Sequence, residues 1–587
     1  MRYSLPQKNR GVVLSHSIKE LCLLAESNYE KLNKISLTPE FSLATRFKLR
    51  AKVFQISQAH FQRLGITLRD HESKVSVQPL RHKLDPRCSM LDSRCSMLDA
   101  GKGSSIQHRA SSIQHRGSSI QPPASWDERL QSKIVIATGH QPIFYHPGIL
   151  FKDMVVNALI ERGGFWGLNL VVDSDTWPGQ LIPIPCLRDG ILSLERVELF
   201  SREKNVAAEE LPSPGLEEFE ANWNYISQKI ERLLPGSNRR TFVRYSEITR
   251  GLIPFCKNLP ELVVFSRRLF EEEMGFKHAE VFLSSLCGGE EFLYFVSLIL
   301  VRAKEFVLKY NSRLEQYRTK KGIRHPLSPF PNLKIEDSRL ELPFWIWEPG
   351  QERATLYLKF TGPQAWICRN EEEILDLKAA HLSSQNIPEL SDWLGRLEAA
   401  GYKLRPKALM LTLFARLFLC DLWIHGVGGA EYEELNNQLA GDLFSVSLPP
   451  YAVASATLYL GIKGEEQGPV VDERQIEALR NQLRLMQFNP ERFIDSADEE
   501  SQRLIAERTS LIERMRSVNG PKGELHQKVL AINDSLRDKI APFRQAVESQ
   551  LREKEMAWAQ ESMAANREFP FFLYSQDDLT ALYSSVV

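Results

Sequence analysis

Residues 134–172 constrain the fold of this chain of 587 residues more than any other stretch. The apolar run 134–137 leads into a turn rich in glycine, histidine and proline, residues 149–162 have a helical pattern, and 168–172 is a second apolar run. A strand, a turn, a helix and a strand within about 40 residues form a βαβ unit, and such units build parallel sheets. The sequence therefore predicts an α/β core around a parallel sheet.

The chain that precedes this unit has two different patterns. Residues 1–71 predict a helical arm, with one helix around 18–32 and another that begins at Pro39. Residues 72–124 contain seven-residue near-repeats, RCSMLDS then RCSMLDA, and SSIQHRA then SSIQHRG. They offer too few apolar residues for a coiled coil, so we predict a disordered low-complexity insertion without a role in chemistry.

The core is predicted to span residues 125–470, with a connective insertion at about 210–400. Within it we expect one long helix from Glu290 to about Lys320, an antiparallel strand pair at 341–350 and 355–360, and a return to α/β structure at 405–458.

Residues 471–587 have a different pattern, in which apolar residues recur at spacings of four and three with a break at 519–521. This predicts a coiled-coil helical hairpin and a tail, with a kink at Pro542 in the second arm. The seam between the helices must be buried against the body or against a second copy, and a homodimer through these helices would bury it.

The composition excludes several classes of function. Lys and Arg total 74 and Asp and Glu total 74, so the chain lacks the basic surface that nucleic-acid binding needs. The eight cysteines have no CxxC spacing, which indicates reduced thiols in a cytoplasmic protein and no zinc site, so no metal is expected. The longest apolar stretch is about half of the 20 residues that a membrane span needs, so no membrane association is expected.

The turn that follows the first core strand is the first candidate site. A strand, a glycine turn and a helix N-terminus form a natural site for a phosphate or carboxylate, and histidine and lysine side chains add donors. In the alternative interpretation, the Pro and Gly residues only shape the turn and the histidines bind local backbone groups. The residues concerned are Thr138, Gly139, His140, Gln141, His146, Gly148 and Lys152.

The end of the second apolar run supplies a pair of carboxylates, Asp173 and Asp175. By topology they lie at the same sheet edge as the first turn, where they would hold the amine of a substrate. The alternative is that one of them caps the next turn.

A glycine-rich loop near residue 428 is the third candidate. Gly428 and Gly429 allow a backbone to approach a ligand closely, and Glu431 follows at a helix start. An acidic residue there also suits the helix dipole without any ligand.

These motifs, in this order, resemble the bacillithiol biosynthesis cysteine-adding enzymes, which show a TGQQ-type turn, a helix with a lysine, a DHD-type strand end and a GGPGE-type loop. The resemblance implies a Rossmann-like core related to class I aminoacyl-tRNA synthetases, a connective insertion and a C-terminal coiled coil that dimerises. The implied chemistry joins the carboxyl group of cysteine to a sugar amine. The matching residues here are 138–141 with Lys152, 173–175 and 428–431.

The sequence departs from that pattern at His140, Ser174 and Ala430, all within the presumed site, so its substrate need not be that of the family. The hypothesis is a ligase or transferase that joins an amino acid to an amine-bearing, sugar-like acceptor, with ATP or ADP as candidate cofactors. His140, His146, Asp173 and Asp175 are its candidate catalytic residues. The alternatives are a non-catalytic dimeric interaction protein on the same scaffold and a nucleotidyltransferase-like enzyme with another substrate.

Overall fold

The computed structural model describes residues 4–35, 43–64, 133–177, 181–188, 191–199, 206–462, 473–495, 498–517 and 523–587. The predicted insertion at 72–124 and the predicted helix start at Pro39 lie outside the described residues.

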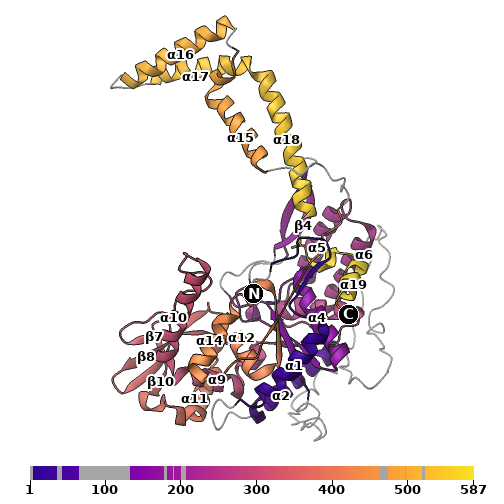
Figure 1. Ribbon diagram of the computed structural model, residues 1–587, viewed down its shortest axis with the longest axis vertical. Helices are drawn as coiled ribbons and strands as arrows, with labels where there is room; N and C mark the ends of the chain where they lie inside the picture. Colours follow the sequence, from indigo (N-terminus) through magenta and orange to yellow (C-terminus); the bar gives the residue numbers. More distant parts are fainter. Residues whose placement is uncertain are drawn as a thin grey trace, which may run out of the picture.

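Figure 1 shows a six-stranded sheet in the body of the protein, beside the helices α1 (Ile18–Leu32) and α4 (Pro147–Gly163), and its strand order is β1-β13-β12-β2-β3-β6. Five neighbouring strands are parallel, and only the edge strand β1 runs antiparallel to its neighbour β13. The predicted α/β core with a parallel sheet is therefore confirmed. The bounds are β1 (Gly11–Leu14), β2 (Val135–His140), β3 (Trp166–Val171), β6 (Ala279–Phe282), β12 (Leu422–His425) and β13 (Ala452–Thr457).

Helix α4 (Pro147–Gly163) joins β2 to β3 and completes the predicted βαβ unit. It begins at the N-cap His146 and ends at Gly164, whose φ of 66° is a left-handed conformation that suits glycine. Nearly every residue from Pro147 to Ile160 is buried, because the helix lies between the sheet and the helices α1 (Ile18–Leu32) and α19 (Gln576–Ser584).

The N-terminal helices belong to this core. Helix α1 begins with a capping box between Ser17 and Glu20 and coincides with the predicted helix at 18–32. Helix α2, described over Leu43–Leu64, contacts β6. Because β1 pairs with β13, the N-terminal segment extends the central sheet as well.

Between β3 and β6 the chain forms a two-stranded hairpin and three helices, with a second helical segment beyond β6. Their bounds are β4 (Leu181–Arg188), β5 (Ile191–Glu198), α5 (Leu216–Ile230), α6 (Gly236–Leu252), α7 (Leu259–Glu273), α8 (Ser284–Cys287), α9 (Glu290–Leu300) and α10 (Ala303–Lys321). The prediction of one helix from Glu290 to Lys320 is wrong. Arg302, with φ −117° and ψ 20°, leaves the helical conformation and separates the buried α9 from the amphipathic α10.

A second, antiparallel sheet of five strands follows, in the order β10-β9-β8-β7-β11. Strands β7 and β8 confirm the predicted antiparallel pair at 341–350 and 355–360. The bounds are β7 (Arg339–Trp347), β8 (Ala354–Thr361), β9 (Gln364–Arg369), β10 (Glu372–Lys378), α11 (Ile387–Ala399) and β11 (Lys403–Pro406), followed by α12 (Ala408–Phe414), a π-helical turn (Ala415–Leu419), α13 (Val427–Ala430) and α14 (Glu433–Phe444).

Four C-terminal helices extend from the body as a long arm (Figure 1). They are α15 (Glu473–Phe488), α16 (Glu499–Ser517), α17 (Gly523–Lys539) and α18 (Ala541–Ala564). Leu511 of α16 packs with Val529 and Leu536 of α17, as the apolar spacing predicts. Pro542 does not kink a helix: it lies in the first turn of α18, where the missing N–H needs no partner.

None of the helices in the described ranges combines the length and the apolar character that a bilayer span requires.

Candidate functional site

The order of the parallel strands reverses between β2 and β12. The chain adds β3 and β6 on one side of β2, then crosses to the other side for β12 and β13. The loops that leave β2 and β12 therefore diverge at the carboxyl edge, which is where ligands bind in open α/β sheets. His140 ends β2 and His425 ends β12, so both lie at this edge.

Gly139 and Lys152 connect β2 to α4. The Lys152 Nζ donates a hydrogen bond of 2.8 Å to the Gly139 carbonyl, and burial lowers the pKa of Lys152 to about 8. A Cβ at Gly139 would lie 2.8 Å from the Leu170 carbonyl oxygen and 3.0 Å from the Trp423 ring, so only glycine fits here. Thr138 is structural, since its hydroxyl donates to the Ile424 carbonyl of β12 at 2.9 Å.

Two imidazoles flank this edge in opposite tautomers. His140 Nδ1 lies 3.2 Å from the Gln141 carbonyl, which can only accept, so Nδ1 carries the proton and Nε2 keeps a lone pair. His146 Nδ1 accepts from the Gly148 N–H at 3.0 Å, so its proton lies on Nε2. Burial lowers the pKa of both histidines to about 3, together with the positive charge of Lys152 for His140 and those of Arg567 and Lys152 for His146. At neutral pH one ring therefore offers an acceptor and the other a donor.

The last residue of β12 brings a further histidine to the edge. His425 Nδ1 accepts from the Trp423 indole at 3.3 Å, and its Nε2 lies 3.3 Å from Glu433 Oε1. Burial alone would raise the pKa of Glu433, but His425 and Arg416 lower it to about 2. The glycine-rich motif in the sequence begins at His425 but does not include Glu433, which is only two residues beyond Glu431 in the same acidic run.

The predicted glycine loop lies beside this pair. Gly428 and Gly429 are exposed in the short helix α13, where a Cβ at Gly429 would lie 2.9 Å from His425 Nδ1. Glu431 is exposed as well, so the buried carboxylate of this loop is Glu433 and not Glu431.

The two predicted carboxylates have different environments. Asp173 is buried and accepts from both the backbone N–H (3.0 Å) and the hydroxyl of Ser284, so it caps the start of α8. Burial and the neighbouring Glu209 raise its pKa to about 7. Asp173 therefore binds a segment 111 residues away and not the next turn that the capping alternative names, and both of its carboxylate oxygens already accept hydrogen bonds.

Asp175, by contrast, is 41% exposed and lies next to the first turn. Its Oδ2 accepts from Gln141 Nε2 at 2.6 Å, and its Oδ1 accepts from Arg353 Nη1 at 2.9 Å. Arg353 directly precedes β8, so the antiparallel sheet contributes a charged group to this edge.

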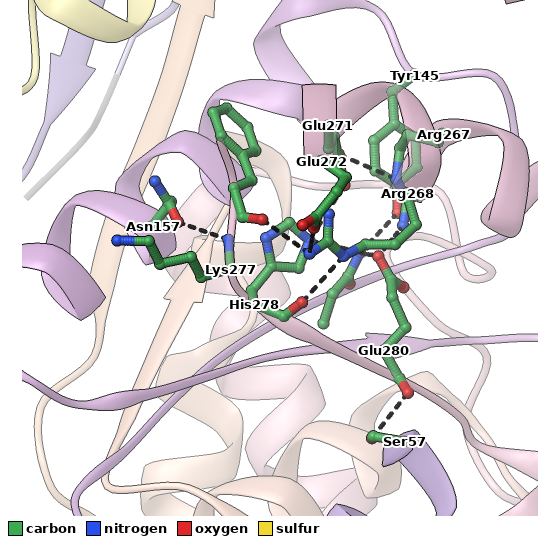
Figure 2. A network of polar contacts seen from close by, with 12 residues as sticks. Ser57, Tyr145, Asn157, Arg267, Arg268, Glu271, Glu272, Lys277, His278 and Glu280 are labelled. Atoms are coloured by element: carbon green, nitrogen blue, oxygen red, sulfur yellow. Dashed lines mark hydrogen bonds and ion pairs between the residues drawn. The ribbon is translucent and has the colours of Figure 1, made fainter. Parts of the chain in front are cut away.

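A buried polar network joins side chains of α4, α7 and β6 (Figure 2). Ligand atoms of Asp153, Glu271 and His278 all lie within 4.8 Å of one another, close enough to hold a metal ion. The His278 Nε2 is 3.2 Å from a Glu271 carboxylate oxygen.

Two cationic side chains, Arg267 and His278, already lie in this network. Arg267 bonds Glu280, and its guanidinium stacks 4.2 Å from the Tyr145 ring centroid. Burial alone would lower the pKa of His278, but the carboxylates of Glu271 and Glu280 raise it to about 9. Arg267 and protonated His278 thus lie beside the carboxylates of Glu271 and Glu280, and the absence of a metal stays a prediction.

No protein-family model matches this chain, and a search of curated proteins finds no match. The function is therefore inferred from the geometry of the sheet edge.

Proposed function

We propose that this protein is an enzyme that joins the carboxyl group of an amino acid to the amine of an acceptor, with a phosphate-bearing ligand such as ATP or ADP at the sheet edge. The observation that carries the proposal is the convergence of Lys152, His140 and His146 where the strand order reverses. Buried basic groups at such an edge are suited to phosphate oxygens.

The strand order supports a nucleotide-binding class of fold. Numbered along the chain, the five parallel strands lie in the order 3-2-1-4-5, which matches the first five of the six strands of doubly wound dinucleotide-binding sheets. We propose on this basis a Rossmann-like core of the class I synthetase type, with the sheet of β7 to β11 as its connective insertion.

Each residue at this edge has a separate role in the proposed reaction. The Lys152 ammonium and the His146 Nε2–H hold negatively charged oxygens, and the exposed face of Asp175 binds the substrate ammonium group. The lone pair of His140 Nε2 accepts a hydrogen bond from the attacking amine and orients it, and the proton of the amine leaves with the departing oxygen. The C–N bond forms as one C–O bond of the carboxyl group breaks, and that oxygen leaves as water or with a phosphoryl group. A nucleotide, when bound, supplies the phosphoryl group that improves this leaving group. Gly428, Gly429 and Glu431 of the exposed loop would close over the ligands.

Product formation tests the proposal. The full chain is incubated with ATP or ADP, single amino acids including cysteine, and an amino-sugar acceptor such as glucosaminyl malate, and mass spectrometry searches for the sum of the two substrates minus water. Lys152→Met should abolish the product. Lys320→Met, which changes an exposed lysine paired with Glu434, should retain it. An absence of any amide product across the amino acids, or equal activity of Lys152→Met, contradicts the proposal.

A second candidate is a non-catalytic interaction protein that dimerises through the arm. Phe488, Leu530 and Phe543 favour it, because 64%, 42% and 48% of their surfaces are exposed on these helices. Light scattering of the wild type and of Phe543→Ser tests this candidate. The candidate is supported if the wild type is a dimer that binds no ligand at the sheet edge and the variant is a monomer.

A further inference from the structure

A guanidinium from the C-terminal part of the chain reaches the same edge of the sheet. Arg567 lies between α18 and α19, yet its Nη1 donates to the Thr457 hydroxyl and its Nη2 to the Ser455 hydroxyl, each at 3.3 Å. Both hydroxyls belong to the carboxyl end of β13, beyond the residues that pair with β12. The guanidinium is therefore placed at the ligand edge by residues more than a hundred positions away.

Arg567 also covers the first turn of α4. A Cβ at Gly148 would lie 2.4 Å from Arg567 Nη2 and 2.6 Å from the Ala456 carbonyl oxygen, so the absence of a side chain at Gly148 makes room for the guanidinium. The positive charge of Arg567 contributes, after burial, to the low pKa of His146. Arg567 and the Nε2–H of His146 thus offer donors at one place.

The surrounding segment holds Arg567 rigidly. The Phe571 N–H donates to the Tyr145 carbonyl at 2.7 Å, and the Tyr574 hydroxyl donates to the Leu458 carbonyl at 3.0 Å. Asn238 Nδ2 donates to the Leu573 carbonyl at 2.9 Å. This arrangement fixes the guanidinium before any ligand arrives, which lowers the entropic cost of binding.

Arg567 differs from other arginines of the core in that it forms no direct ion pair with a carboxylate among the described residues. Arg50, Arg267, Arg405 and Arg416 each contact a buried or nearly buried carboxylate. Within the described residues Arg567 has no carboxylate partner, and its side chain contacts two neutral hydroxyls instead. The carboxylate of the next residue, Glu568, acts on Arg567 without forming a direct ion pair, so the half-buried guanidinium keeps donors for an anionic ligand.

The hydroxyls of Thr457 and Ser455 differ in whether they can donate a hydrogen bond to such a ligand. The Thr457 hydroxyl donates its proton to the Pro6 carbonyl at 2.7 Å and serves only to hold Arg567. The Ser455 hydroxyl accepts from Arg567, and among the described residues it donates to no other group, so its proton is available to an anion.

We infer that Arg567, Ser455 and His146 form a subsite that binds a phosphoryl group of the nucleotide. The inference rests on one part of the proposed function, namely that a phosphate-bearing ligand binds at this edge. It adds the C-terminal segment around Arg567 to the site. Guanidinium, hydroxyl and imidazole N–H donors together match the several oxygens of a phosphoryl group.

Calorimetric titration of the full chain with ADP, pyrophosphate and adenosine tests the subsite. Arg567→Gln should raise the Kd for ADP and pyrophosphate about tenfold to hundredfold, because a charge-assisted pair is lost. Arg567→Lys should recover part of the affinity. Arg313→Gln removes the same charge from an arginine of α10 that pairs with Asp442 and should bind ADP as the wild type does.

The outcomes separate this inference from the proposed function. Equal ADP affinity in Arg567→Gln, or equal affinity of the wild type for adenosine and ADP, overturns the subsite even if amide product forms. Weakened ADP binding in the variant supports the subsite even if no amide product is found. If Arg567→Gln does not fold, Ser455→Ala replaces it, with an expected rise in Kd of about threefold to tenfold, and an unchanged Kd overturns the inference.

Discussion

Substitution of Asp421 should cost more stability than most single substitutions in the core, because its one carboxylate joins α2 and β2. Its Oδ1 accepts from Arg46 at 3.1 Å and from Arg50 at 2.9 Å, both on α2, and its Oδ2 accepts from the Val135 N–H of β2 at 2.8 Å. The side chain is completely buried. Asp421→Asn keeps the shape of the residue and removes the charge between two buried guanidinium groups.

The size of the expected loss follows from these distances. Two opposite charges about 3 Å apart attract by about 5–6 kcal/mol at an effective dielectric constant of about 20, so two pairs lose about 11 kcal/mol of gross attraction. The desolvation of the carboxylate, which the variant avoids, offsets more than half of that. The net loss expected on removing one partner of a buried ion pair is about 3–5 kcal/mol.

Asp442→Asn is the matched control. It breaks the two-fold contact with Arg313, at 2.7 Å for each hydrogen bond, in a partly exposed position on α14, and should cost about 1 kcal/mol. Urea unfolding followed by tryptophan fluorescence measures the free energy of unfolding of each variant. Hydrogen exchange of the amides of α2 should be faster than in the wild type only in Asp421→Asn. Equal losses in the two variants, or unchanged exchange over α2, would be inconsistent with this role of Asp421.

Three further predictions concern the sheet edge and the buried network. Gly139→Ala should lower the melting temperature and abolish stabilisation by ADP, because the new methyl group meets the Leu170 carbonyl and the Trp423 ring; a thermal shift equal to that of the wild type would contradict the packing. The pKa of His140 is lowered to about 3, so the ring resonance of His140, assigned by comparison with His140→Asn, should not titrate between about pH 5 and pH 8. For the same reason the contribution of His140 to the stability of the fold is present above about pH 6.5 and is lost as the pH falls towards 3. The pKa of His278 is raised to about 9, so His278→Gln should destabilise the protein most below about pH 6.5 and progressively less as the pH rises through 9; thermal melts that show the opposite trend would exclude a charged imidazole.

Local patterns in the sequence predict the elements whose causes are local. Helix α1 coincides with its predicted range because Ser17 and Glu20 form a capping box directly before an apolar repeat. The βαβ unit is recognisable for the same reason, and its short turn keeps His140, His146 and Lys152 near one another. The break at Arg302 has no such signal, because neither glycine nor proline marks it, and only the different surroundings of α9 and α10 separate the two helices.

The rest of the site depends on pairs that are distant in the sequence. The sequence around Asp173 leaves this residue free to bind a substrate, but its partner Ser284 lies 111 positions later. Arg567 meets Ser455 across 112 positions, and no local motif indicates that contact. A single sequence shows which side chains are available for chemistry, whereas the tertiary fold decides which of them are already occupied.

Titration of the full chain with ADP tests whether the edge between β2 and β12 binds a phosphate-bearing ligand. Calorimetry should show one ADP per chain for the wild type and for Lys320→Met, and at least about a tenfold weaker affinity for Lys152→Met, whose ammonium group faces this edge. Absence of ADP binding by the wild type, or equal affinity in Lys152→Met, would show that this edge is not a phosphate site.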